Sequence, residues 1–263
     1  MTTPVRKIGI ETVGHGGAGD FFPGNSRQAL EQAVRLGVDR VEFDVQESGD
    51  GELLLLHDER IRAGNGDLVA VRAARTPDLR RLIDGLLTFA EALEVLGPDL
   101  PLIVDVKAPG FERLLVAELG RLARGRDVIV STTYVQTIRT VKRAIPRLRY
   151  GLSTGHLATA WNSAAFRSLA TAMQPHLLPR PMIAAARWCG ATEVMIQHHV
   201  CSDLLVQRCH AAGLGVYAWT VDRPAHIDRV IGHGVDGIIS NRPDLVRERL
   251  ETISPAAGVD DRT

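Results

Sequence analysis

Two acidic residues and a histidine lie at chemically useful spacing in the stretch RVEFDVQESGDGELLLLHDE, residues 40–59. Glu42 and Asp44 are two positions apart in a segment typical of a β-strand, so their side chains point to the same face of that strand. Two neighbouring carboxylates repel each other unless a positive charge lies between them. A divalent cation meets this need, and Mg2+ and Ca2+ both prefer oxygen ligands.

A second pair with the same spacing follows in LIVDVK, where Asp105 and Lys107 are also two positions apart. Asp105 offers a third carboxylate, and Lys107 offers a positive charge that could hold an anionic oxygen or balance the acids. A zinc site would be dominated by histidine and cysteine instead. The set therefore predicts a site for a divalent metal ion, Mg2+ or Ca2+, beside a phosphate.

Two histidines, His15 and His57, end strand-like segments on either side of these acids. A pair of histidines can divide phosphoester cleavage, one acting as nucleophile or base and the other protonating the leaving alkoxide. Each residue alone has an ordinary explanation, such as a charged strand face, an ion pair or a hydrogen-bonded structural histidine. The functional interpretation rests on their convergence, because groups suited to one reaction recur at the ends of neighbouring strands.

Short apolar runs alternate with helical patterns along the chain, and these elements must position the polar groups. The predicted strands are KIGIETVGH, RVEFDVQ, ELLLLHD, PLIVDVK, DVIVSTT, RYGLSTG, EVMIQHH, GVYAWTV and GIIS. A helix is predicted over NSRQALEQAVRLGV, with Asn25 or Ser26 as its N-terminal cap and Gly37 at its end. Residues 60–85 predict a long loop with one short helix.

This alternation predicts an α/β protein. ELLLLHD follows the turn-rich SGDG and suits a hairpin-like excursion. The other eight strands, mostly followed by helices, in a chain of this length fit a closed (β/α)8 TIM barrel better than an open doubly wound sheet. We expect a single domain over residues 1–250 and a disordered tail over residues 251–263. In such a barrel, functional side chains lie at the carboxyl ends of the strands, which is where the acids and histidines occur in the predicted elements.

The composition limits the kinds of partner. Of the 263 residues, 45% are hydrophobic, and 31 basic residues balance 31 acidic ones to give a formal net charge of zero. This balance does not favour nucleic acid or a strongly anionic membrane as partner. The three cysteines lack the spacing of a disulfide framework or a metal site. Without a signal peptide or an integral membrane segment in the pattern, we expect a cytoplasmic protein, whose oligomeric state the sequence does not determine.

The motifs GHGG, PGNS, VEFDVQESGDGELLLLHDE, LIVDVK, AWTVD and GIISNRPDLV occur in an order and spacing that span residues 8–248. In these motifs the chain resembles the glycerophosphodiester phosphodiesterase family. The resemblance implies a TIM barrel of the PLC-like phosphodiesterase type, which hydrolyses small-molecule glycerophosphodiesters to glycerol 3-phosphate and an alcohol with a divalent metal ion. The implied site comprises catalytic His15 and His57, metal ligands Glu42, Asp44 and Asp105, a phosphate contact at Lys107, and a pocket aromatic at Trp219.

The chain departs from the pattern of this family at several positions. Gly16 stands where the family has a phosphate-contacting arginine, and Gly24 stands where it has a glutamate. The two losses are consistent with each other, because a glutamate without the arginine would be an unpaired charge. Asp105 replaces the usual glutamate, as in the related spider-venom phospholipase D group. His198 is an unexpected strand-end residue that could contact substrate, although a polar rim residue explains it as well.

Two other functions remain open at this stage. One is phospholipase D-like or sphingomyelinase D-like cleavage of a lysolipid or sphingolipid, for which the small and apolar stretch at residues 160–179 could form an entrance. The other is a non-catalytic phosphoester-binding relative that lost catalysis together with the arginine. The presence of both histidines beside all three carboxylates argues against a decayed site.

Overall fold

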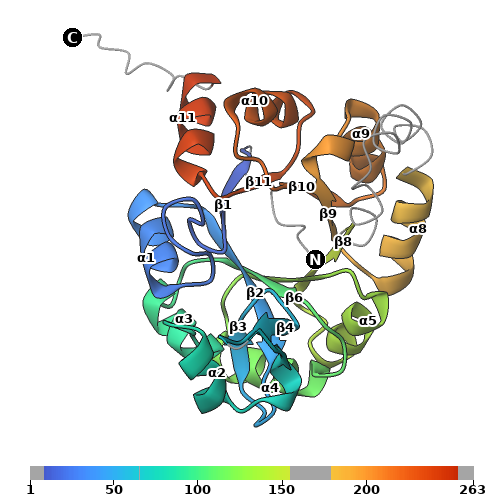
Figure 1. Cartoon of the computed structure of the whole chain (residues 1–263). Coiled ribbons are helices and arrows are strands. Elements are labelled where there is room, and N and C mark those ends of the chain that lie inside the picture. The colour runs from blue at the N-terminus through green and yellow to red at the C-terminus, as the bar shows by residue number, and fades with distance from the viewer. Residues whose placement is uncertain (1–8, 65, 155–178, 254–263) are drawn as a thin grey trace.

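The computed structural model describes residues 9–64, 66–154 and 179–253, which form a closed parallel β-barrel surrounded by helices (Figure 1). The eight barrel strands are β1 (Glu11–His15), β2 (Arg40–Glu47), β6 (Leu102–Val106), β7 (Val128–Thr132), β8 (Arg149–Ser153), β9 (Glu193–Gln197), β10 (Gly215–Trp219) and β11 (Gly237–Ser240). Strand β1 pairs in parallel with both β2 and β11, which closes the barrel. The predicted (β/α)8 fold is confirmed.

Helices follow most of the strands and cover the outside of the barrel (Figure 1). They are α1 (Arg27–Leu36), α2 (Thr76–Leu82), α3 (Phe89–Leu96), α4 (Glu112–Leu122), α5 (Val135–Ala144), α8 (Pro179–Cys189), α9 (Asp203–Ala211), α10 (Pro224–Gly232) and α11 (Pro243–Ile253), with short 3-10 turns η1 (Val71–Ala73) and η2 (His198–Val200). The predicted ends of α1 are confirmed. Ser26 accepts a hydrogen bond from the Ala29 N–H, and Gly37 adopts the left-handed conformation that glycine tolerates best.

The chain between β2 and α3 leaves the barrel. Strand β3 (Leu53–Leu55) pairs antiparallel with β2, so it extends the sheet without entering the closed ring. A hairpin of β4 (Arg60–Arg62) and β5 (Leu68–Ala70) follows, in the segment where the sequence predicts a long loop with one short helix; the helix is α2. These strands have three residues each and lie mostly exposed, so they carry no hydrophobic alternation that a sequence pattern could reveal.

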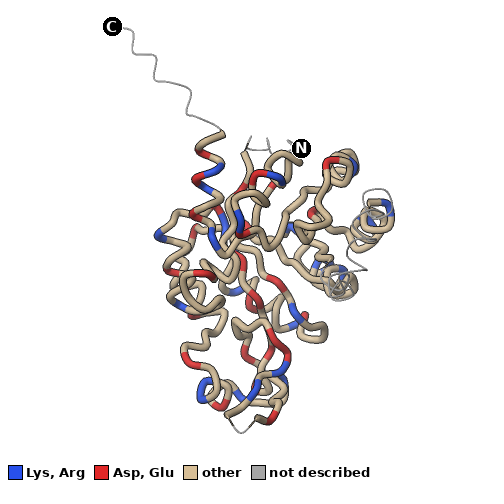
Figure 2. The backbone as a smooth tube through the Cα atoms, turned by 45° about the horizontal axis from the view of Figure 1, so that its top comes forward, with Lys and Arg blue, Asp and Glu red and all other residues tan. Residues whose placement is uncertain are grey.

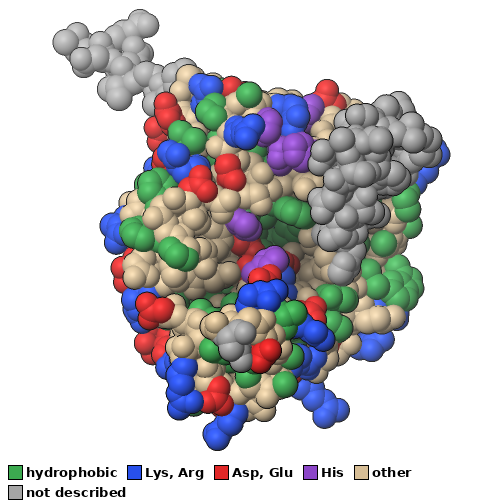
Figure 3. Space-filling view, viewed as in Figure 1, with side chains coloured by type: hydrophobic (Ala, Val, Ile, Leu, Met, Phe, Trp, Pro, Cys, Tyr) green, Lys and Arg blue, Asp and Glu red, His purple; other side chains and the backbone are tan. Residues whose placement is uncertain are grey.

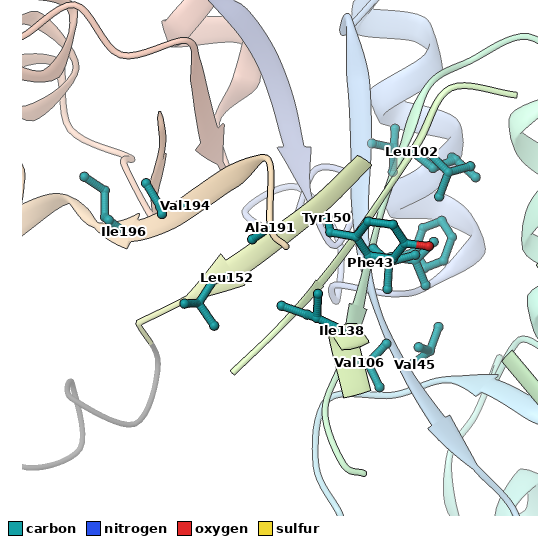
Figure 4. Close-up of a cluster of buried hydrophobic side chains, with 14 of the residues drawn as sticks. Phe43, Val45, Leu102, Val106, Ile138, Tyr150, Leu152, Ala191, Val194 and Ile196 are labelled. Atoms are coloured by element: carbon teal, nitrogen blue, oxygen red, sulfur yellow. The ribbon is translucent and has the colours of Figure 1, made fainter. Parts of the chain in front are cut away.

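The main hydrophobic core lies between the outside of the barrel and the helices. Figure 4 shows side chains of several strands and of α5 within this layer, among them Phe43, Tyr150 and Ile138. Phe43, which lies between Glu42 and Asp44 in sequence, packs edge-on against Phe89 of α3 at a ring separation of 5.9 Å. Strand alternation therefore sends the aromatic ring outward and the two acids inward, as predicted. The three cysteines are buried free thiols.

The inside of the barrel is filled in layers. At the amino ends of the strands, the fully buried Arg40 pairs with Glu11 and Asp127, and Arg149 pairs with Glu193. Above this lies an apolar layer of six residues: Val13, Ile103, Ile129, Met195, Tyr217 and Ile239. The acids and histidines singled out in the sequence lie above it, at the carboxyl ends.

Charged residues of both signs are spread over the described backbone, and Figure 2 shows no face of a single sign. Among the described residues, no helix combines the length and the apolar character needed to cross a bilayer. Helix α11 continues to Ile253, and residues 254–263 lie outside the described part of the chain. The single domain and the disordered tail stay predictions.

Candidate active site

Three carboxylates meet at the carboxyl ends of two neighbouring strands. Glu42 and Asp44 come from β2 and Asp105 from β6, and the register of these strands places Asp44 directly beside Asp105. One oxygen from each of the three carboxylates lies within 4.8 Å of the other two. Glu42 and Asp44 are each only 4% exposed. The structure thus brings together the three predicted metal ligands in a buried position, where their mutual repulsion is severe.

Lys107 supplies the positive charge nearest to these acids. Its ammonium Nζ lies 2.6 Å from Asp105 Oδ2 and 2.7 Å from Asp44 Oδ1. Burial alone would lower the pKa of Lys107, but the carboxylates of Asp105, Asp44 and Glu42 outweigh it and raise that pKa. The lysine is therefore held protonated beside the acids, where a phosphate oxygen could also be bound.

One lysine does not satisfy three carboxylates. Burial and the nearby Asp44 raise the pKa of Glu42 above its usual range. Asp105 Oδ1 is buried and has no hydrogen-bond donor within the described part of the chain. A buried oxygen without a partner beside a carboxylate with a raised pKa fits a divalent cation that binds hard oxygen ligands. The residues present therefore fit a Mg2+ or Ca2+ ion.

The loop after β1 orients the acids on β2. The amide N–H of Gly16 donates to Glu42 Oε2 at 3.0 Å. Asn25 donates through Nδ2 to Asp44 Oδ2 at 2.8 Å, and its Oδ1 accepts from the Asp44 N–H at 3.1 Å. A methyl group at Gly16 would lie 3.0 Å from the Gly24 Cα, so the two departures from the family pattern lie against each other.

His15, at the end of β1, is held by a chain of hydrogen bonds. Its Nδ1 lies 2.8 Å from Asn241 Oδ1, and Asn241 Nδ2 donates to Asp222 Oδ2 at 2.9 Å. Its other nitrogen, Nε2, lies 4.0 Å from Glu42 Oε2. Burial lowers the pKa of His15, but the Glu42 carboxylate and the bond to Asn241 outweigh this effect and raise it.

His57 lies beyond β3, at the outer edge of the same site. Its side chain is 65% exposed, and its Nδ1 lies 2.7 Å from Asp58 Oδ1. The backbone places it there through a hydrogen bond from the Leu56 N–H to the Asp44 carbonyl. His57 is thus a histidine at the mouth, in contrast to the more enclosed His15.

One cleft of about 710 Å3 at the carboxyl end of the barrel is lined by five of these residues: His15, Glu42, His57, Asp105 and Lys107. Figure 3 shows histidine, acidic and basic side chains around a hollow at the centre of this face. Trp219 also lines the cleft, and its indole Nε1 is buried without an acceptor among the described residues. Further wall residues are Asp58, Glu59, Ser131, Thr133, Tyr134 and Ser153.

His198 is the predicted site residue that the structure keeps apart from this group. It lies in η2 after β9 and is not among the residues that line the cleft. Its ring stacks against His199 and His226, and Arg229 donates to both its Nδ1 and its carbonyl. A contact with substrate stays a prediction without support from this placement.

Several residues near the reacting groups escaped sequence reasoning. The sequence predicts Asn25 only as a possible helix cap, and it gives no role to Asn241 or Asp222. Asn25 has a positive φ of 64°, which places its side chain against Asp44 while Ser26 caps α1. Asp222 and Asn241 come shortly after the ends of β10 and β11, and this position at the carboxyl ends of barrel strands is the signal that could have found these two.

Comparison with known proteins gives the family. The model of the glycerophosphoryl diester phosphodiesterase family matches residues 15–245. The chain belongs to this family. A glycerophosphodiester phosphodiesterase of Caldanaerobacter subterraneus subsp. tengcongensis is 28% identical over 89% of the chain and 95% of that protein. The protein named "Probable glycerophosphodiester phosphodiesterase 2" of Mycobacterium tuberculosis is 30% identical over 94% of the chain and 92% of that protein.

Solved structures share the barrel of this family member. A phosphodiesterase from Oleispira antarctica, solved in complex with the product sn-glycerol-3-phosphate, matches with a TM-score of 0.75 at 20% identity. The match covers 91% of this chain and 96% of that one. A glycerophosphodiester phosphodiesterase from Thermotoga maritima matches with a TM-score of 0.69 at 19% identity, over 92% and 100% of the two chains. At these identities the likeness shows the fold.

Proposed function

We propose that the protein hydrolyses glycerophosphodiesters to glycerol 3-phosphate and an alcohol, with a divalent metal ion as cofactor. The observation that carries this proposal is the cluster of three carboxylates and one lysine beside a cleft that both histidines line. The family relationship and the product-bound relative from Oleispira antarctica support the same substrate class.

Glu42, Asp44 and Asp105 would hold Mg2+ or Ca2+, which supplies Lewis-acid stabilisation of the phosphoryl oxygens when bound. Lys107 contributes a second positive charge for a phosphate oxygen. His15, whose Nε2 lies 4.0 Å from Glu42 Oε2, would act as nucleophile or base. His57, whose side chain is exposed, would protonate the leaving alkoxide, because the released alcohol must exit toward solvent.

The two open alternatives gain no support from a specific observation. The stretch proposed as a lipid entrance lies, for residues 160–178, outside the described residues. A non-catalytic role would leave the assembled acids, lysine and histidines without a physical purpose. A cytoplasmic location and a part in lipid metabolism, through breakdown of deacylated phospholipids, fit the proposed small-molecule substrate and stay proposals.

The test is direct. The purified protein is incubated with glycerophosphocholine and glycerophosphoethanolamine in Mg2+, in Ca2+ and in EDTA, and the products are followed by phosphorus NMR. We expect glycerol 3-phosphate to form in one or both metals and not in EDTA. A cyclic phosphate as the end product would point to the phospholipase D-like reaction, and no turnover in either metal would contradict the proposal.

A further inference from the structure

The outer wall of the cleft carries an acidic and aromatic surface that the hydrolysis itself does not use. Asp58 and Glu59 follow His57 directly, in the connection from β3 to β4. Tyr134 lies at the start of α5 on another wall, and Trp219 ends β10. All four residues line the cleft. Asp58 and Glu59 are exposed, whereas Tyr134 and Trp219 are half-buried, and Trp219 packs against the apolar layer inside the barrel.

Of the two acids on this outer wall, Glu59 is the one without an ion pair to another described residue. Asp58 is engaged by His57 at 2.7 Å. Glu59 and Tyr134 line the same cleft, and burial together with the Glu59 carboxylate raises the pKa of Tyr134. Lys107, the lysine among the described lining residues, is already held by Asp44 and Asp105.

We propose that Glu59, Tyr134 and Trp219 form a subsite for a cationic alcohol, so that the preferred substrates carry an ammonium or quaternary ammonium group on the leaving side. This inference rests on the proposed hydrolysis. A diester of a neutral alcohol carries a net negative charge, which Asp58 and Glu59 repel. A diester of an aminoalcohol is a zwitterion whose cation faces the same carboxylates. The aromatic rings add cation–π attraction.

The position of the reacting groups supports this orientation. If His57 protonates the leaving oxygen, then the alcohol lies beside His57, and the residues that follow it in the chain contact the remainder of that alcohol. The glycerol phosphate half then lies on the metal and Lys107 side, further inside the barrel. Glu59 is thus a specificity residue and makes no contact with the phosphate.

The experiment compares kcat/KM for two zwitterionic substrates, glycerophosphocholine and glycerophosphoethanolamine, with two anionic ones, glycerophosphoglycerol and glycerophosphoinositol. Glu59→Gln should lower kcat/KM for the zwitterions by about fivefold, mainly through KM, and raise it for the anionic diesters. The quantity compared is the ratio of kcat/KM for the zwitterionic substrates to kcat/KM for the anionic ones. Any loss of folded protein in a variant cancels in this ratio. Glu52→Gln, which removes an exposed carboxylate outside the described lining of the cleft, serves as the matched control.

Three outcomes are distinguishable. A ratio that falls in Glu59→Gln but not in Glu52→Gln supports the subsite. Hydrolysis of all four substrates with the same ratio in both variants overturns it and leaves the proposed function intact. Absence of hydrolysis of every substrate contradicts the proposed function itself.

A second observation, independent of the first, concerns the protonation of His15. The Asp222 carboxylate only accepts hydrogen bonds, so the amide group of Asn241 that faces it at 2.9 Å must be the NH2 group. Its carbonyl oxygen therefore faces His15 Nδ1, 2.8 Å away, and this nitrogen must carry a proton to make the bond. Asp222 also accepts from the Asn241 N–H and from Ser240 Oγ, which fixes the carboxylate.

We infer that Asp222 and Asn241 are positioning residues that hold neutral His15 as the Nδ1–H tautomer, with the lone pair of Nε2 directed toward the acids and the cleft. Gly19 is part of this arrangement, because a Cβ at that position would lie 2.5 Å from Asn241 Oδ1. Neither Asp222 nor Asn241 is among the lining residues of the cleft, so both act through His15.

The test measures the tautomer directly. Nitrogen-15 NMR of the histidine rings, with Mg2+ present and at a pH where imidazole is neutral, should show His15 as the Nδ1–H form. In Asp222→Asn the Asn241 amide can flip, and we expect the Nε2–H form to become populated and kcat to fall about tenfold or more with little change in KM. Asp228→Asn, on the exposed side of α10, is the control.

An unchanged His15 tautomer in Asp222→Asn, or the Nε2–H form in the unaltered protein, overturns this inference. The NMR measurement needs no substrate, so its result stands even if the proposed reaction proves wrong.

Discussion

Lys107 Nζ lies 2.7 Å from Asp44 Oδ1, between carboxylates that we propose as metal ligands. The lysine therefore neutralises part of the negative charge that would attract a cation, and it also keeps that charge tolerable when no cation is bound. Lys107 should therefore lower the affinity of these carboxylates for a metal ion, while its positive charge should assist catalysis.

Replacement of Lys107 by Met should separate these consequences. We expect tighter binding of Mg2+, because the carboxylates lose a competing counter-ion, together with a fall in kcat of roughly a hundredfold or more, because a charge for the phosphoryl oxygens is lost. Calorimetric titration with Mg2+ and steady-state kinetics measure the two effects. Lys142→Met on α5 is the control, and weaker metal binding in Lys107→Met would contradict the argument.

Glu42→Gln should weaken the metal dependence. Glutamine keeps an oxygen that can accept from the Gly16 N–H but lacks the negative charge. We expect the Mg2+ concentration for half-maximal activity to rise roughly tenfold or more. Glu47→Gln, at the last residue of β2 and paired with Arg72, should titrate like the unaltered protein. Coincident titration curves would remove Glu42 from the ligand set.

His57→Ala should abolish most turnover without harm to the fold, because the side chain is largely exposed and packs against little. We expect kcat to fall by a factor of roughly 10² to 10⁴, the range found for a lost general acid or base. The thermal midpoint should stay within a few degrees of the original. A rate within a factor of two would refute the catalytic role.

Arg40→Met should destabilise the barrel and spare the chemistry. The guanidinium is 1% exposed and pairs with Glu11 at 2.9 Å and Asp127 at 2.6 Å. Its loss leaves two carboxylates at the amino end, and we expect the free energy of unfolding to fall by about 3 kcal/mol, because these acids are partly exposed and can be rehydrated. Urea denaturation measures the loss. Arg35→Met, exposed on α1, should change stability far less.

His198 should make the protein sensitive to acid. Burial, and the neighbouring His199, His226 and Arg229, lower the pKa of His198 from 6.5 to about 3. Between these pH values the unfolded chain binds a proton at His198 that the folded chain does not bind. Protonation therefore leaves the stability of the folded protein unaffected above pH 6.5 and lowers it as the pH falls below 6.5. At pH 5 we expect the free energy of unfolding to be lower by about 2 kcal/mol for this reason, from the conversion of a pKa difference into free energy.

His198→Asn, which keeps a group able to bond with Arg229, provides the comparison. Other titrating groups are shared by the two proteins and cancel in the difference. Urea denaturation at pH 7.5 and pH 5 should show a smaller loss of stability in the variant. Parallel losses in both proteins would show that His198 does not titrate as described.

The part of the site that sequence predicts is the part set by local geometry. The two-residue spacing of Glu42 and Asp44 fixes their common face wherever a strand forms, and the same holds for Asp105 and Lys107. The contact between His15 and Asn241 joins residues 226 positions apart. It exists because β1 pairs with β11 when the barrel closes, and no pattern within either segment reveals the partner.

The fold also divides into elements that the local sequence predicts and elements that depend on tertiary contacts. The hydrophobic periodicity of the sequence reveals the apolar strands and the amphipathic helices, so the barrel could be predicted from their order. The β4 and β5 hairpin depends on contacts outside its own short strands, and position 198 depends on how the chain turns after β9, where η2 carries the ring away from the cleft toward α10. Side-chain direction after a strand end is a tertiary property.

The apolar layer of Val13, Ile103, Ile129, Met195, Tyr217 and Ile239 closes the interior beneath the acids. Substrate and both products must then pass through the same mouth. With the proposed roles of these residues, the alcohol released beside the exposed His57 would depart first, and the phosphate product held by Lys107 would depart last. After such an ordered release, glycerol 3-phosphate would compete with incoming substrate for the empty site. The reaction would therefore slow as this product accumulates.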